Sequence, residues 1–288
     1  MSDAPTAIRR WIAGDLRALR MTRGLKRRQV ADHLGKSEAA IGHFETGFSL
    51  ASAAELDKLL DFYGVPERKE FFRELRRAAK SGRDWWLYLG DVVPDWFNLY
   101  LGVERAAQRI ESYDALWVPG LLQTEDYGRA LIKEINPGID ADRLDRQMEL
   151  RAGRQSILER STPQVSVHTV IDESALRRRV GGPSVLARQL DHLLALRDHP
   201  HITVQVLPAT HGGHPGADGT CTLLTFPPEL EHDPGLVYIE TAVRGIYVED
   251  HDELQIYRER LERLRTIAAD PAHSTELIAN ARKELTAA

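Results

Sequence analysis

The stretch LKRRQVADHLGKSEAAIGHFETG, residues 25–47, decides the fold of the N-terminal part of the chain. Apolar residues recur in it at helical spacing on both sides of Gly35: Val30, Ala31, Leu34, Ile41 and Phe44. Gly35 readily adopts the left-handed conformation that ends many helices. Ser37 then offers a side-chain oxygen that caps a following helix. The stretch therefore predicts two short helices that cross at a tight glycine turn, which is a helix-turn-helix.

Further helices are expected on either side of this stretch. An apolar stripe precedes Gly24, formed by Trp11, Ile12, Leu16 and Leu19. The segment SAAELDKLLDFYGV, residues 52–65, carries a second stripe, formed by Leu56, Leu59, Leu60 and Tyr63. A last helix is expected to begin near Pro66, since proline suits a first helical turn. We therefore predict an all-α N-terminal domain of about five helices over residues 1–80.

Residues 12–66 resemble the phage-repressor and Cro type of helix-turn-helix, known as the xenobiotic-response-element family. The motifs that carry the resemblance are LRALR before Gly24, the segment FETG at 44–47 and the closing helix 52–65. The resemblance implies binding to double-stranded DNA. It also implies a recognition helix that runs from Ser37 to about Glu45 and enters the major groove.

The same resemblance assigns roles to individual side chains. Glu38, Ala39 and His43 fall where the family places base-facing residues, and Arg27 falls at a phosphate-contacting position. Glutamate can accept a hydrogen bond from a cytosine amino group, whereas alanine can only make an apolar contact, such as one with a thymine methyl. The full set of expected DNA-binding residues is Arg27, Arg28, Lys36, Ser37, Glu38, Ala39, His43 and Thr46.

The expected recognition helix contains no arginine, although arginine to guanine is the commonest specific contact. DNA shape and arginines outside this helix are therefore expected to contribute to recognition. An alternative stays open, in which the domain is a protein-interaction module with the shape of a helix-turn-helix and little direct DNA reading.

The charge distribution favours DNA contact near the N-terminus. Residues 1–83 hold 17 Lys and Arg against 11 Asp and Glu, a net charge of +6. The remaining residues hold 21 against 32, a net charge of −11. A basic region next to an acidic one places the expected nucleic-acid contact in the first third of the chain.

A hinge is expected at residues 81–92, because KSGR at 80–83 combines charge with Ser-Gly. Three of the five tryptophans follow closely, at Trp85, Trp86 and Trp96. Aspartates rather than basic residues are interleaved with them, which argues against a stacking platform for nucleic acid. We expect this aromatic stretch to form core or dimer interface.

Residues 93–288 predict an α+β domain with a small, mostly antiparallel sheet flanked by helices. Alternating β-branched segments indicate strands at 164–173, 202–208, 219–226, 236–243 and 245–250. Helical spacing indicates helices at 125–134, 140–159, 185–196, 251–268 and 274–285. Region 96–160 is expected to be mainly helical, broken at 118–124.

This C-terminal region also resembles one group of actinobacterial regulators. The segments that carry the resemblance are VPGLLQTEDYGRAL (118–131), ESALRRRVGG (173–182), QLDHLLAL (189–196), VQVLP (204–208) and VYIE (237–240). The group joins the helix-turn-helix to a C-terminal domain of unknown function and includes the WhiJ-like and Scr-type antitoxin-like proteins. The resemblance implies transcriptional control, often beside a gene for a short partner protein, and implies no catalytic activity.

Catalysis or metal sensing is the remote alternative. His211 and His214 lie in a glycine-rich segment, and Cys221, His168 or Glu173 are conceivable further ligands. Ligands on a flexible loop are not held in a tetrahedral arrangement, so a surface loop is expected instead. Glu173 and Glu240 at strand ends are too few to define acid–base chemistry. Cys221 is expected in the core, and we expect no enzyme activity, no cofactor and no metal.

The composition favours a cytoplasmic protein. The longest apolar run is far shorter than the ~18 residues that a membrane span needs. No apolar stretch followed by a cleavage site marks a signal peptide in the first 20 residues. The single cysteine excludes an internal disulfide.

The sequence predicts a homodimer that reads a palindromic operator with two recognition helices about 34 Å apart. The C-terminal domain would set their separation, and a ligand or partner protein would shift occupancy through the hinge by its differential affinity for two dimer arrangements.

Overall fold

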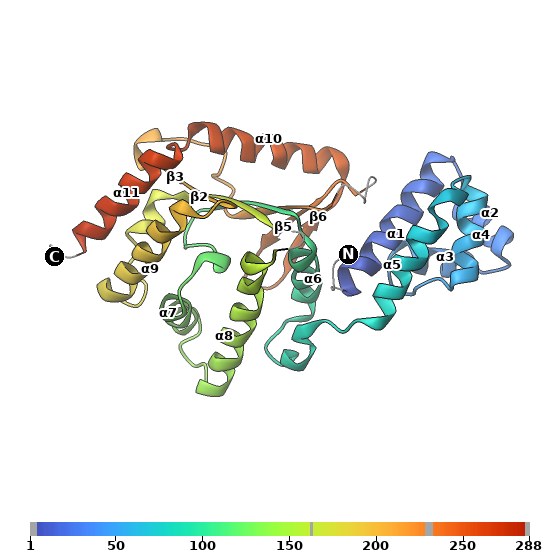
Figure 1. Ribbon diagram of the computed structural model, residues 1–288, viewed down its shortest axis with the longest axis horizontal. Helices are drawn as coiled ribbons and strands as arrows, with labels where there is room; N and C mark the ends of the chain where they lie inside the picture. The colour runs from blue at the N-terminus through green and yellow to red at the C-terminus, as the bar shows by residue number, and fades with distance from the viewer. Residues whose placement is uncertain (1–4, 162–163, 228–232, 286–288) are drawn as a thin grey trace. The chain divides into compact units, whose positions relative to one another are not determined.

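The computed structural model describes residues 5–161, 164–227 and 233–285 (Figure 1). The chain forms two compact units. Unit 1 comprises the described residues of Met1–Leu87, Asn98–Ala106 and Phe226–Pro234. Unit 2 comprises those of Tyr88–Phe97, Ala107–Thr225 and Gly235–Ala288. The domain limits expected from the sequence, 1–80 and 93–288, stay a prediction.

The N-terminal part of unit 1 is all-α, as predicted. Its helices are α1 (Pro5–Thr22), α2 (Arg27–Leu34), α3 (Glu38–Glu45), α4 (Ala53–Tyr63) and α5 (Lys69–Ser81), with a short 3-10 turn at Pro66–Arg68. The predicted apolar stripes meet in one core, where the most deeply buried side chains include Ile8, Ile12, Leu16, Val30, Ile41, Leu56, Leu59, Leu60 and Phe72.

Two further segments pack on α1 within unit 1. Helix α6 (Asn98–Ala106) approaches it so closely that a Cβ added at Gly102 would lie 3.2 Å from the backbone nitrogen of Ala7. From residues 226–234, Phe226 packs edge-on against Trp11 with ring centroids 5.3 Å apart, and Asp233 pairs with Arg10 at 2.5 Å. The sequence analysis had grouped these segments with the C-terminal domain.

The sheet of unit 2 has six strands among the described residues: β1 (Arg109–Asp114), β2 (Ser166–Asp172), β3 (Ile202–Leu207), β4 (Cys221–Thr225), β5 (Leu236–Glu240) and β6 (Gly245–Val248). Their spatial order is β3-β2-β1-β4-β5-β6. Strands β1, β2 and β3 are parallel, whereas β4, β5 and β6 continue the sheet antiparallel. A mostly antiparallel sheet in an α+β domain was predicted and is confirmed.

The sequence analysis missed strand β1, which lies within region 96–160. That region is mainly helical, as expected, apart from this strand and its connections. The segment RIESYD pairs with β2 on one side and β4 on the other, so it lies in the interior of the sheet. Five of its six residues are buried, and Glu111, Ser112 and Asp114 are among them. A buried strand that carries polar side chains lacks the apolar pattern by which strands are recognised.

Helices flank the sheet as expected: α7 (Glu125–Ile135), α8 (Ala141–Gln155), α9 (Pro183–Ala195), α10 (His251–Ile267) and α11 (Pro271–Glu284). Helix α10 covers one face, where Leu254, Leu261 and Leu264 join a core with side chains of the strands. Figure 1 shows α10 running along the sheet. Among the described residues, no helix is both long and apolar enough to cross a membrane.

Candidate nucleic-acid interface

The turn between α2 and α3 has the geometry that the sequence predicts. Gly35 is left-handed (φ 65°), and its N–H meets carbonyls of the last turn of α2. The Ser37 side chain accepts a hydrogen bond from the Ala40 N–H at 3.2 Å, so it caps α3. Ile41 and Phe44 are buried. The helix therefore packs through one side and presents the other to solvent.

The exposed side of α3 carries the three residues expected to face bases. Glu38, Ala39 and His43 are all exposed. The helix itself, EAAIGHFE, contains neither lysine nor arginine. A DNA duplex at this surface would meet a carboxylate, a methyl group and an imidazole, whereas the positive charge comes from neighbouring segments.

The sequence analysis missed the feature that holds α3 in place, a carboxylate bound by two arginines. The Glu45 side chain, 1% exposed, binds Arg20 of α1 at 2.5 Å and Arg27 of α2 at 2.8 Å. A second bond from Arg20 makes that pair bidentate. Hydrogen bonding to Glu45 raises the pKa of Arg20 above its ordinary value. We call these three residues the Glu45 clamp. They tie the first three helices together.

Arg27, expected at phosphate, therefore also has a structural role. Its Nε donates to Glu45, and its side chain remains 39% exposed. The guanidinium lies beside Gly42 of α3, where an added Cβ would be 3.9 Å from Nη1. The terminal nitrogens thus lie next to the recognition helix, where they can donate to phosphate or base.

The other expected backbone contacts surround α3. Arg28 is exposed at the start of α2. Lys36 is also exposed but pairs with Glu55 at 2.8 Å, and this contact, opposed by partial burial, lowers the pKa of Glu55 to about 2. A phosphate would therefore share Lys36 with a carboxylate. Thr46 is exposed, and its hydroxyl donates to the Gly42 carbonyl at 3.0 Å, so its proton is engaged by the backbone of α3.

An aromatic residue that the sequence analysis did not single out adjoins this surface. Phe48 follows α3 and packs against the His43 ring, with centroids 4.7 Å apart and planes tilted by 48°. Nothing in the hydrophobic spacing marks it, because Phe48 lies in a connection between helices. All eight expected DNA-binding residues and Phe48 thus lie on or next to α2 and α3.

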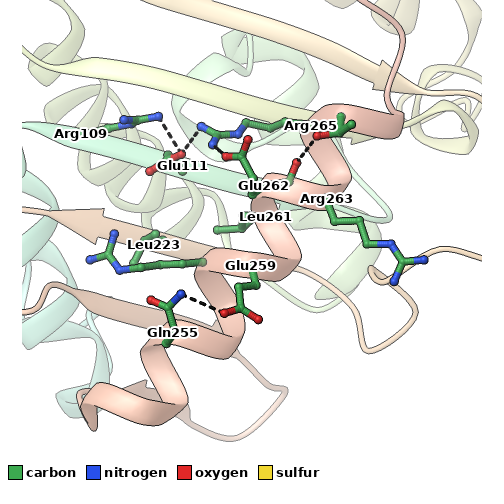
Figure 2. Close-up of a pocket in the computed structure, with 11 residues that line it drawn as sticks. Arg109, Glu111, Leu223, Gln255, Glu259, Leu261, Glu262, Arg263 and Arg265 are labelled. Atoms are coloured by element: carbon green, nitrogen blue, oxygen red, sulfur yellow. Dashed lines mark hydrogen bonds and ion pairs between the residues drawn. The ribbon is translucent and has the colours of Figure 1, made fainter.

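Unit 2 contains a second candidate site, a surface pocket of about 600 Å³ beside α10 (Figure 2). Glu111 of β1, a buried residue, lines this pocket and accepts from Arg109 at 3.0 Å and from Arg265 at 2.6 Å. Leu223 and Leu261 add apolar surface. The pocket therefore offers charged groups of both signs beside apolar surface.

The residues considered for metal binding or catalysis do not form a cluster. Within the described parts of the chain, no three His, Cys, Asp or Glu side chains are placed to hold a metal ion. His214 packs edge-on against Tyr113, and His168 bonds to Gln205 at 2.6 Å. Cys221 lies in the core, as predicted, and burial raises the pKa of its thiol to about 12.

The two carboxylates considered for acid–base chemistry, Glu173 and Glu240, are also engaged elsewhere. Glu173 binds Arg177 at 2.5 Å and accepts from the Ala209 N–H at 2.8 Å. Glu240, at the end of β5, accepts from the Tyr238 hydroxyl at 3.2 Å. Each carboxylate thus has its own local partner.

Comparison with known proteins agrees with both parts of this architecture. A family model described as a helix-turn-helix domain matches residues 11–71, the range that contains α2 and α3. A second model, described as domain of unknown function (DUF5753), matches residues 97–280. Comparison with curated proteins gave no match, and comparison with solved structures gave none either. Because the second match covers more than half of the chain, the protein belongs to the DUF5753 family and carries a helix-turn-helix domain ahead of that family's domain.

Proposed function

We propose that the chain is a sequence-specific transcription regulator of the xenobiotic-response-element type, which binds DNA through α2 and α3. The observation that carries the proposal is the exposed, capped helix α3, fixed to α1 and α2 by the Glu45 clamp. Such a rigid helix with an exposed side is what major-groove reading requires. The match to a helix-turn-helix domain supports DNA as the partner.

The proposed contacts divide into two kinds. Glu38 accepts a hydrogen bond from a cytosine amino group, Ala39 makes an apolar contact, and His43 reads a base edge. Phosphates are bound by Arg27, Arg28 and Lys36, with the hydroxyls of Ser37 and Thr46 nearby. Because α3 has no lysine or arginine, this second kind of contact supplies the affinity and depends strongly on salt.

We propose that the C-terminal domain joins two chains into a dimer that reads a palindrome, and that it senses a ligand or a partner protein. The pocket beside α10 supports the ligand version, since it combines 600 Å³ of space with charged walls. A ligand there competes for Arg109 and Arg265, because both already bind Glu111. It shifts DNA occupancy only through different affinities for two dimer arrangements. The proposal assigns no chemical reaction to the chain.

An antitoxin-like role belongs to the same proposal. In that version a short protein encoded beside this gene is the partner, and DNA binding adjusts its supply. Co-expression of the adjacent reading frame, followed by size-exclusion chromatography of the tagged chain, tests it. Elution of the short protein with the chain supports the role, and separate elution contradicts it.

The decisive experiment measures binding of the full chain to the DNA upstream of its own gene at several salt concentrations. We expect selective binding, and we expect the logarithm of the binding constant to fall linearly with the logarithm of the salt concentration. Arg28→Ala should lower the magnitude of this slope by about one, because it removes one phosphate contact. Lys80→Ala is the charge-matched control, since Lys80 is exposed near the end of α5, a helix that packs on α1 and α4.

His43→Ala completes the series, because it alters a base-facing residue and should reduce selectivity more than total binding. A folded protein without selective binding would contradict the proposal. In that case the protein-interaction alternative, in which the helix-turn-helix shape serves as a docking platform, becomes the better account.

A further inference from the structure

Phe48 is an exposed aromatic side chain at the edge of the candidate DNA-binding surface. Its side chain is 80% exposed, more than that of any other large hydrophobic residue in the described part of the chain. A single exposed apolar residue is common on protein surfaces and by itself indicates nothing. Phe48 differs because it follows a hydrogen-bonded turn and because its ring contacts His43, a residue that already faces the proposed DNA.

The backbone after α3 holds this side chain in place. Gly47 is left-handed (φ 74°), which reverses the chain, and a Cβ added there would lie 3.6 Å from the Arg9 carbonyl oxygen of α1. The Ser49 N–H then donates to the His43 carbonyl at 3.2 Å. This turn brings Phe48 back beside the exposed His43, where the two rings pack 4.7 Å apart. The aromatic pair is therefore part of the surface that α3 presents.

The chemistry of α3 indicates what this pair would contact. The helix has none of the side chains that pair bidentately with purines: arginine, lysine, asparagine or glutamine. Ala39 and Phe48 instead offer apolar surface. The apolar group that the major groove displays is the C5 methyl of thymine.

We infer that Phe48, supported by His43, is a specificity residue that packs on a thymine methyl group in each half-site of the operator. The inference rests on the proposed function, because it needs α3 in the major groove. It adds a thymine preference at the base pair next to the one read by His43. A second copy of this chain is the alternative occupant of Phe48, and the experiment below separates the two.

The test begins with the full chain and its selected operator, in which each thymine is replaced in turn by deoxyuridine, which lacks only the methyl group. We expect one replacement per half-site to weaken wild-type binding about 3–10-fold. This effect lies at the lower end of what a bidentate base contact contributes, because a methyl contact is apolar. Phe48→Ala should weaken binding to the natural operator by a similar factor. Phe48→Ala should also bind the natural operator and the operator with deoxyuridine at the sensitive position equally well. Phe48→Leu, which keeps apolar bulk, should retain the thymine preference.

Three controls make the outcomes distinguishable. Met21→Ala removes another exposed apolar side chain, 59% exposed in the last turn of α1, and should leave every affinity unchanged. Circular dichroism checks that the variants fold. Sedimentation measures whether Phe48→Ala changes the oligomeric state.

The results have separate meanings. Equal deoxyuridine penalties in wild type and Phe48→Ala overturn the inference but leave the proposed function intact. Loss of dimer without loss of thymine preference also overturns it, in favour of a second copy at Phe48. Absence of any selective DNA binding by the wild-type chain overturns both the proposed function and this inference.

Discussion

The carboxylate of Glu45 joins three helices although it lies in the interior of the N-terminal unit. Burying an ion pair is expensive, but removing one partner leaves an uncompensated buried charge and is more costly still. Two arginines share this carboxylate, and they differ in exposure: Arg20 is 12% exposed and Arg27 is 39% exposed. The two should therefore contribute unequally to stability.

Replacing Arg20 by alanine should lower the free energy of unfolding by about 3–5 kcal/mol, the usual effect of breaking a buried pair. Replacing Arg27 should lower it by about 1 kcal/mol or less, since Glu45 retains the bidentate Arg20 and Arg27 is partly solvated. Urea unfolding followed by tryptophan fluorescence measures both. Equal losses would show that the clamp is not organised around Arg20.

Asp114, on β1, is a second buried carboxylate, but it has no basic partner. Burial raises the pKa of this carboxyl to about 6, although Ser112 and Thr169 donate hydrogen bonds to it at 2.6 and 3.0 Å. In the unfolded chain the group titrates at its ordinary pKa of 3.8. The folded state therefore holds the proton more tightly, and ionisation disfavours folding.

This shift predicts how stability depends on pH. Below pH 3.8 both states are protonated and Asp114 imposes no penalty. The penalty grows as pH rises from 3.8 and is complete above pH 6, at on the order of 3 kcal/mol. Asp114→Asn keeps an acceptor for both hydroxyls without the charge, so it should gain more stability over wild type at pH 8 than at pH 5. If the difference between the urea midpoints of wild type and Asp114→Asn is the same at pH 5 and pH 8, the raised pKa of Asp114 is contradicted.

At the scale of elements, local signals decided what was predictable from the sequence. The helices carried apolar spacing, glycine ends and capping residues, and Ser37 and Ser52 cap α3 and α4 in the structure. Strand β1 carried no such signal, because its polar residues are satisfied by partners from distant parts of the chain. The Glu45 clamp was missed for the same reason, since it requires the crossing of α1 and α3.

The cap of α3 allows folding and binding to be separated. Ser37→Ala removes the bond to the Ala40 N–H and should destabilise the protein by about 1 kcal/mol. Ser37→Asp keeps a capping oxygen, so stability should be preserved, but it adds negative charge where DNA phosphates are expected. We therefore expect Ser37→Asp to bind DNA more weakly than Ser37→Ala despite its higher melting temperature. The reverse order of affinity would place the DNA away from the start of α3.

At the scale of the whole molecule, unit 1 does not end where the helix-turn-helix ends. Helix α6 packs on α1, and the tight approach of Gly102 to Ala7 shows that their backbones are in close contact. Tyr100, Leu101 and Val103 of α6 are buried. The sequence indicated the helix-turn-helix correctly, but no local pattern reveals that a later helix belongs to the same core.

A fragment of residues 1–106 should therefore be more stable than a fragment of residues 1–87. Each kcal/mol of added packing raises the melting temperature of a unit of this size by about 4–8 °C, and we expect at least one such increment. Gly102→Leu in the longer fragment should abolish the gain, because a side chain there collides with Thr6 and Ala7. Calorimetry of the three proteins measures the effect, and identical melting temperatures would contradict it.

The chain returns to unit 1 twice after leaving it, at α6 and at the described residues of Phe226–Pro234. The helix-turn-helix domain therefore cannot be exchanged as an independent domain in this protein, because later segments share its core. A chimaera could replace residues 1–87 by an unrelated DNA-binding domain. It would lose the α1 surface that α6 and Phe226 contact, including the Trp11 ring beside Phe226. Re-targeting such a regulator to a new operator thus calls for changes confined to the exposed side of α3, with α1 left as it is.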